Sequence, residues 1–92
     1  MIKSFKCRDT EALFADRVVP RFKDFERPAR RKLMYLHQAK QLQDLRSPPG
    51  NRLEPLSGDR AGQFSIRIND QWRLCFTWDN GDVHDVEIVD YH

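Results

Sequence analysis

Apolar residues recur at every second position through the last third of the chain, which is the period of a β-strand with one buried face. The pattern divides into residues 64–68, 72–78 and 84–88, separated by Asn69-Asp70-Gln71 and Asp79-Asn80-Gly81. The Asn-Gly pair is typical of a tight hairpin turn. We therefore expect three antiparallel strands. Their predicted core residues are Phe64, Ile66, Trp72, Leu74, Phe76, Val86 and Ile88.

The N-terminal quarter combines a weak strand pattern with a short helix. Residues 1–7 alternate weakly and predict a strand at an edge or in the centre of the sheet. Asp9 and Thr10 then offer N-cap oxygens to a helix that includes residues 11–14. Residues 18–24 contain a proline and are expected to form a connector.

A second helix is predicted to begin near Pro28, because proline fits the first helical turn. Its apolar stripe consists of Ala29, Leu33 and Leu36, with Met34 as a further candidate. Leu42 and Leu45 predict one more helical turn, and the Ser-Pro-Pro-Gly-Asn sequence at 47–51 ends the helical part.

Helices that precede three strands predict an α+β fold. We expect one domain, residues 1–92, in which two N-terminal helices pack on one face of a twisted, mainly antiparallel sheet of about four strands. With 92 residues and 39% hydrophobic content, the chain can form one modest core. It has no apolar run near the roughly 20 residues of a membrane helix and no signal peptide pattern, so a cytoplasmic protein is expected.

Cysteine, histidine and charge limit the chemistry. Cys7 and Cys75 lie in predicted strands and are expected to be free thiols, and the three histidines are well separated, so we expect no metal site and no cofactor. The net charge is only +2, but Lys and Arg are concentrated between residues 17 and 40. A basic flank of this kind is compatible with RNA binding without proving it.

Strand register gives the first sign of a site. If Ile68 and Trp72 both face inward, the loop between them has three residues and Arg67 lies directly opposite Arg73 on the exposed face. Like charges opposed across strands are destabilising. The same counting across the second hairpin puts Glu87 beside Arg73. The row is therefore either a solvated Arg–Glu–Arg surface or a pair of guanidiniums that binds phosphate.

The last three residues are Asp90, Tyr91 and His92. Histidine is the usual proton carrier near neutral pH, and a neighbouring α-carboxylate favours its protonated form. Tyr91 can stack on a base, and Asp90 can accept the proton of the 2′-hydroxyl or orient a neighbour. Cleavage of RNA without a metal needs a general base, cations at the phosphate and a general acid. Two arginines and the Asp-Tyr-His sequence supply side chains of these types. The alternative is a frayed chain end without a role.

Three segments resemble HigB toxins of the RelE/ParE toxin superfamily. They are residues 55–62 (PLSGDRAG), 64–76 (FSIRINDQWRLCF) and 87–92 (EIVDYH), and the opening residues 1–5 are also similar. The resemblance implies ribosome-dependent, metal-independent cleavage of mRNA in the decoding site. It also implies a helix-turn-helix antitoxin of the HigA type, which represses the operon and connects the toxin to operator DNA.

The resemblance also assigns roles to residues. It implies that Arg73 binds the phosphate, that Arg67 assists it, and that Asp90, Tyr91 and His92 form the C-terminal part of the catalytic site. Arg27, Arg30, Arg31 and Arg60 are expected to contact ribosomal RNA, with a merely solvated surface as the alternative.

At two positions the chain departs from part of the family. Some members have a lysine where this chain has Ser57, and a histidine where it has Glu54. If those basic groups stabilise the transition state, this enzyme should be slower, and the identity of its general base is open.

Two other functions remain possible for a chain with this sequence. One is a ParE-like toxin that binds DNA gyrase and cleaves nothing, and the other is a non-catalytic RNA-binding module.

Overall fold

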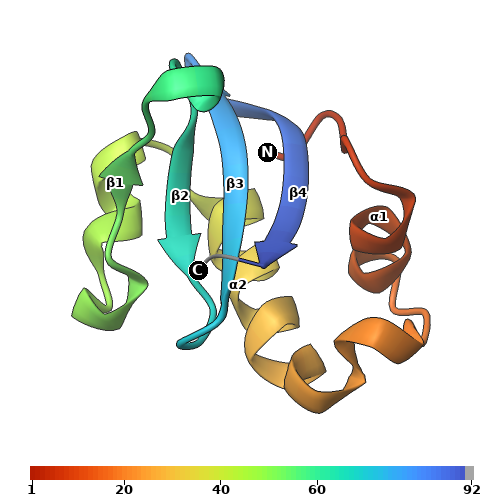
Figure 1. Cartoon of the computed structure of the whole chain (residues 1–92). Coiled ribbons are helices and arrows are strands. Elements are labelled where there is room, and N and C mark those ends of the chain that lie inside the picture. Colours follow the sequence, from red (N-terminus) through yellow and green to blue (C-terminus); the bar gives the residue numbers. More distant parts are fainter. Residues whose placement is uncertain (91–92) are drawn as a thin grey trace.

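The computed structural model describes residues 1–90, which form a helical layer against one face of a four-stranded sheet (Figure 1). Neighbouring strands follow chain order and all pair antiparallel. The strands are β1 (Glu54–Pro55), β2 (Phe64–Arg67), β3 (Trp72–Asp79) and β4 (Asp82–Asp90). The α-helices are α1 (Arg8–Phe14) and α2 (Glu26–Gln38). Short 3-10 helices are η1 (Pro20–Phe25), η2 (Leu42–Arg46), η3 (Pro49–Asn51) and η4 (Gly58–Arg60). The predicted α+β class is confirmed.

The core lies between α2 and the sheet. In the view of Figure 1, α2 lies behind β2 and β3, and α1 lies beside β4. The stripe Ala29, Leu33 and Leu36 is fully buried, as predicted, whereas Met34 is 46% exposed. Five of the predicted strand residues are buried: Ile66, Leu74, Phe76, Val86 and Ile88. Apolar burial on this one face leaves the other face of the sheet for polar chemistry.

Phe64 and Trp72 were expected in the core but are only half-buried. Each is the first residue of its strand and so lies at an end of the sheet. Trp72 still stacks on Phe25 of η1, with 4.8 Å between ring centroids, and so extends the core toward the connector. The connector predicted at 18–24 therefore contains a helical segment that contributes buried aromatic residues.

Both hairpin loops follow from their sequences. The first has three residues, and Asn69 Oδ1 accepts hydrogen bonds from the backbone N–H groups of Gln71 and Trp72. In the second, Asn80 and Gly81 have φ of 51° and 89°, the positive values that a two-residue type I′ turn requires.

The strand expected at residues 1–7 is wrong. This segment lies beside β4 and forms two isolated parallel bridges, Ile2 to Val83 and Phe5 to Val86. Between them β4 bulges at Asp85, where φ is 56° and the backbone N–H donates to the Ser4 hydroxyl. The bulge interrupts the hydrogen-bond ladder, so no continuous strand forms.

The expected N-cap role of Asp9 and Thr10 is also wrong. Helix α1 begins earlier, at Arg8, with Cys7 as its N-cap and no side-chain cap. Thr10 is fully buried instead, and its Oγ1 accepts a hydrogen bond of 3.0 Å from the backbone N–H of Ile88. A residue that suits a helix start therefore ties α1 to β4. No helix within residues 1–90 is long and apolar enough to cross a membrane.

Candidate active site

Arg67 lies directly opposite Arg73, as the three-residue loop predicts. The two side chains share the sheet face that α2 does not cover. Their exposure differs, however: 30% of the Arg67 side chain is accessible and only 9% of the Arg73 side chain. The expectation that both are exposed is therefore wrong for Arg73.

Strand β2 and the segments before it hold the Arg73 guanidinium. Its Nε donates to Ser65 Oγ at 2.8 Å, and its Nη2 donates to the carbonyl oxygen of Arg52 at 2.7 Å. Arg52 follows η3 with φ of 47°, a left-handed conformation that turns the chain toward β1. Strand β1 then pairs Glu54 with Ser65, and Glu54 Oε1 lies 3.5 Å from the same Nη2. The guanidinium therefore has a fixed orientation.

Glu87 does not lie beside Arg73, as the sequence count suggested. Its partner across β3 is Cys75, because the second hairpin turn has two residues and the bulge adds one residue to β4. The Glu87 carboxylate accepts from Arg60 Nη1 at 3.0 Å. Burial raises the pKa of the Cys75 thiol beneath this pair. Both cysteines are free thiols, as expected.

Positive charge is concentrated around Arg67. Its guanidinium pairs with the Asp70 carboxylate, which is almost fully exposed in the hairpin loop. Lys32 is buried at the edge of the helical layer, where its ammonium donates to Asn51 Oδ1. Burial lowers the pKa of Lys32, and the positive charges of Arg31 and Arg67 lower it further. Lys32 and Arg67 therefore lie near enough to feel each other's charge, and each has its own partner, Asn51 and Asp70.

Asp90, the last described residue, lies at the end of β4. Its Oδ2 accepts a hydrogen bond of 3.0 Å from Gln71 Nε2. The register places Asp90 opposite Trp72, on the helix-covered side, whereas Arg73 lies opposite Val89. Tyr91 and His92, the other predicted catalytic residues, lie outside the described residues.

The predicted RNA-binding arginines divide into two groups. Arg60 lies on the open face with Glu87, whereas Arg27, Arg30 and Arg31 belong to α2. Arg30 pairs with Asp16 at 3.5 Å. Arg27 and Arg31 are exposed.

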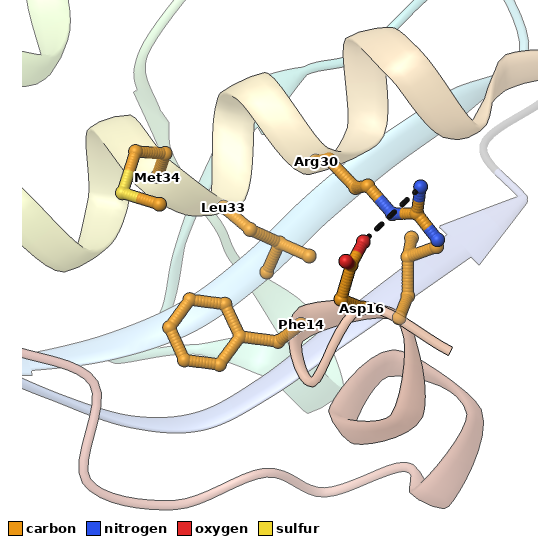
Figure 2. Close-up of a pocket in the computed structure, with 6 residues that line it drawn as sticks. Phe14, Asp16, Arg30, Leu33 and Met34 are labelled. Carbon is orange, nitrogen blue, oxygen red and sulfur yellow. Dashed lines mark ion pairs between the residues drawn. The ribbon is translucent and has the colours of Figure 1, made fainter. Parts of the chain in front are cut away.

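Two cavities lie near predicted site residues. One, of about 240 Å³, lies on the open face and is lined by Glu54, Pro55, Leu56, Ser57 and Arg60. The other, of about 180 Å³, lies between α1 and α2, where the Arg30–Asp16 pair lies beside Phe14, Leu33 and Met34 (Figure 2). Only the first adjoins Arg73, through Glu54. Within residues 1–90, no group of three or more His, Cys, Asp or Glu side chains could hold a metal ion.

Residues 12–92 match the family model of the RelE-like toxin HigB of type II toxin–antitoxin systems. The chain belongs to the HigB toxin family. Toxin HigB-1 of Vibrio cholerae serotype O1 is 41% identical over 85 residues, which cover 88% of this chain and 87% of that protein. Endoribonuclease HigB of Proteus vulgaris is 37% identical over 95 residues and matches over the full length of both chains. The resemblance inferred from the sequence is confirmed.

Solved structures of other toxins share the HigB-family fold. A chain of the YoeB–YefM complex from Staphylococcus aureus superposes with a TM-score of 0.64 at 21% identity, covering 100% of this chain and 95% of that chain. YafQ from E. coli gives 0.63 at 18% identity, covering 98% and 91%. At these identities the likeness shows the fold. Membership of a type II toxin–antitoxin family gives this toxin a protein antitoxin as its partner.

Sequence reasoning missed the groups that hold Arg73. Ser65 could have been found, because strand alternation puts it on the same face as Arg67. The Arg52 carbonyl could not, since its position depends on a left-handed residue after η3. Glu54 was noted only as a departure from relatives, and the structure places its carboxylate beside Arg73.

Proposed function

We propose that this HigB-family toxin is an endoribonuclease that cleaves mRNA in the decoding site of the ribosome, without a metal ion, and so inhibits translation. Family membership and a full-length relative named as an endoribonuclease support the activity. The observation that carries the proposal is the fixed Arg73 guanidinium, held by Ser65 and Arg52 directly opposite Arg67. Prearranged donors of this kind stabilise charge that develops at a phosphate during the reaction.

Each predicted residue has a role in this proposal. Arg73 and Arg67 neutralise the phosphate oxygens in the transition state. His92 donates a proton to the leaving 5′-oxygen, and Tyr91 stacks on a base. Asp90 accepts the proton of the 2′-hydroxyl or orients the groups on that side of the phosphate.

The proposal includes two macromolecular partners. The antitoxin is a helix-turn-helix protein of the HigA type, and the toxin reaches operator DNA only through it. The ribosome is bound through phosphate contacts from Arg60 and from the α2 arginines Arg27, Arg30 and Arg31, which carry charge but no sequence information.

The test compares translating ribosomes with the same mRNA alone, in buffer containing a chelator, and maps the 5′ ends that appear. We expect cleavage within the decoding site only when ribosomes are present. Binding without new ends would support a non-catalytic RNA-binding module. Inhibition of DNA gyrase supercoiling without any mRNA cleavage would support a ParE-like toxin instead.

A further inference from the structure

Asn51 is a fully buried polar residue at the end of η3. Its Nδ2 donates to two backbone carbonyl oxygens, those of Leu45 at 3.1 Å and Ser47 at 3.2 Å. Its Oδ1 accepts a hydrogen bond from the ammonium group of Lys32 on α2. An asparagine amide has two N–H donors, so both are used and the oxygen faces a cation. A flipped amide would put N–H groups against the ammonium, and the side chain therefore has one orientation.

Lys32 is an unusual residue for the buried side of α2. Only 8% of its surface is accessible, and the fully buried stripe of Ala29, Leu33 and Leu36 lies on the same helix. Burial of an ammonium costs free energy unless the group is paired, and burial lowers the pKa of Lys32. The ammonium also lies 5.4 Å from the centre of the Tyr35 ring. A methionine would fill similar space without an ammonium, so the packing of α2 does not explain a lysine here.

The residue that follows Asn51 holds Arg73. The backbone carbonyl oxygen of Arg52 accepts from Arg73 Nη2 at 2.7 Å. The direction of this carbonyl depends on the left-handed conformation of Arg52, with φ of 47° and ψ of 56°. Such a conformation is unfavourable for a residue other than glycine and persists only where its surroundings enforce it. Asn51, the residue before it, supplies such a constraint through its buried side chain.

Two different parts of the fold hold the Arg73 guanidinium. Its Nε donates to Ser65 Oγ within the pair of β2 and β3, whose register is set by the three-residue loop. Its Nη2 donates to the Arg52 carbonyl, whose position depends on η3. Loss of the anchor in η3 would therefore loosen the Nη2 side of the guanidinium, while Nε keeps its acceptor.

We propose that Asn51 and Lys32 are positioning residues that set the orientation of the phosphate-binding Arg73 through the Arg52 carbonyl. The inference rests on the proposed function and adds two residues to that same site. Lys32 fixes the Asn51 amide, the amide fixes the end of η3, and the carbonyl that follows orients the guanidinium. Asn51 is fully buried and Lys32 nearly so, and neither is accessible enough to bind RNA itself. A misplacement of about 1 Å at a reacting centre can cost about 10²-fold in rate.

The first test is single-turnover cleavage of mRNA on saturating ribosomes by two variants, Asn51→Ala and Lys32→Met. We expect both to cleave about 10-fold to 10²-fold more slowly, with no change in the ribosome concentration that gives half the maximal rate. Asn51→Ala keeps the net charge, whereas Lys32→Met removes one positive charge, so a loss shared by both cannot come from charge. If Lys32→Met alone were slow, Lys32 would act through its charge, and the inference would be overturned.

Two control variants make matching changes away from η3. Val83→Ala removes buried volume near the start of β4 and should lower stability. Lys40→Met removes one positive charge from an exposed position. We expect both to cleave at the wild-type rate under conditions in which urea unfolding shows each variant to be folded. If Val83→Ala were as slow as Asn51→Ala, the rate would follow stability and the inference would be wrong.

A double-mutant cycle with Arg73→Ala separates positioning from a general structural effect. If Asn51 acts through Arg73, Asn51→Ala should slow the wild type and have little further effect once residue 73 is changed. A loss by the same factor in both backgrounds would contradict positioning. Lys32→Met enters the same cycle in place of Asn51→Ala if the latter does not fold.

NMR of the arginine side chains in the isolated toxin tests the orientation without ribosomes. The Arg73 signals are identified by their absence from Arg73→Lys. We expect slow rotation of the Nη2 group in the wild type and faster rotation in Asn51→Ala and Lys32→Met, while Ser65 continues to protect the Nε–H. Unchanged rotation in both variants would overturn the inference. Absence of cleavage by the wild type on ribosomes would instead refute the proposed function, and the NMR comparison would still decide whether the two residues hold Arg73.

Discussion

Arg67 and Arg73 face one another across β2 and β3, and they are neutralised in different ways. Arg67 pairs with an exposed aspartate in the hairpin loop, whereas Arg73 is buried against a hydroxyl, a backbone carbonyl and a glutamate. Opposed like charges cost stability unless each has its own partners. The arrangement therefore holds one guanidinium rigidly and leaves the other accessible to RNA.

Arg73→Lys tests whether the planar guanidinium matters beyond its charge. One ammonium cannot reproduce the separate bonds to Ser65 and Arg52, so both charge placement and buried hydrogen bonds suffer. We expect single-turnover mRNA cleavage to slow by roughly 10²–10³. Unfolding in urea should show a loss of about 1–3 kcal/mol. A wild-type rate in this variant would mean that Arg73 is a structural residue.

His92→Gln tests the proton donor assigned from the sequence. We expect a fall of about 10²–10⁴ in the single-turnover rate on ribosomes at neutral pH. The wild-type rate should fall as pH rises above the range in which histidine titrates, since the acid loses its proton. The rate of the variant should not show this decline. Cleavage at the full rate with an unchanged pH profile would exclude His92 from the proton transfer.

Reversing two exposed charges on α2 tests ribosome binding. Arg27→Glu together with Arg31→Glu should weaken binding and flatten its dependence on salt, because fewer phosphate contacts release fewer counterions. Sedimentation of the toxin with ribosomes at several salt concentrations measures both effects. Lys3→Glu with Lys6→Glu provides an equal charge change in the N-terminal segment. If both pairs behave alike, the effect reflects net charge and not an α2 contact.

Thr10 should stabilise the fold through one buried hydrogen bond. Thr10→Val keeps the shape but leaves the backbone N–H of Ile88 without its acceptor, at a cost of about 1–3 kcal/mol. Thr10→Ser keeps the acceptor and loses one methyl group, which costs about 1 kcal/mol. Urea unfolding compares the two. A larger loss in Thr10→Ser would show that packing of the methyl group matters more than the hydrogen bond.

The raised pKa of Cys75 predicts a loss of stability in alkali. Below the ordinary thiol pKa of 9.0, both folded and unfolded chains hold the proton and its contribution is complete. As pH rises from there, the unfolded thiol ionises first, and stability falls until the folded pKa is passed. The stability of the wild type relative to Cys75→Ala should therefore decline above about pH 9. A constant difference would contradict the burial argument.

Alkylation gives an independent check on Cys75. The thiolate is the reactive form, so at neutral pH buried Cys75 should react far more slowly than partly exposed Cys7 in the same molecule. Mass spectrometry of peptides that contain each cysteine would measure both rates. Equal rates would indicate that the face above Cys75 opens readily.

The hydrophobic pattern by itself determined three features: the three main strands, through a period of two, the stripe of α2, through a helical period, and the opposition of Arg67 and Arg73. These features depend on local periods and on a three-residue loop, which neighbouring residues specify. The sequence resemblance also determined the HigB family, since its motifs are contiguous along the chain.

Tertiary structure alone decided the partners of the arginines. The burial of Arg73 depends on Arg52, Glu54 and Ser65, which come together only after the chain turns through η3 and pairs β1 with β2. The position of Glu87 depends on a bulge at Asp85, whose extra residue shifts every later pair. A one-residue change in register is invisible to an alternating pattern, yet it determines which charges meet.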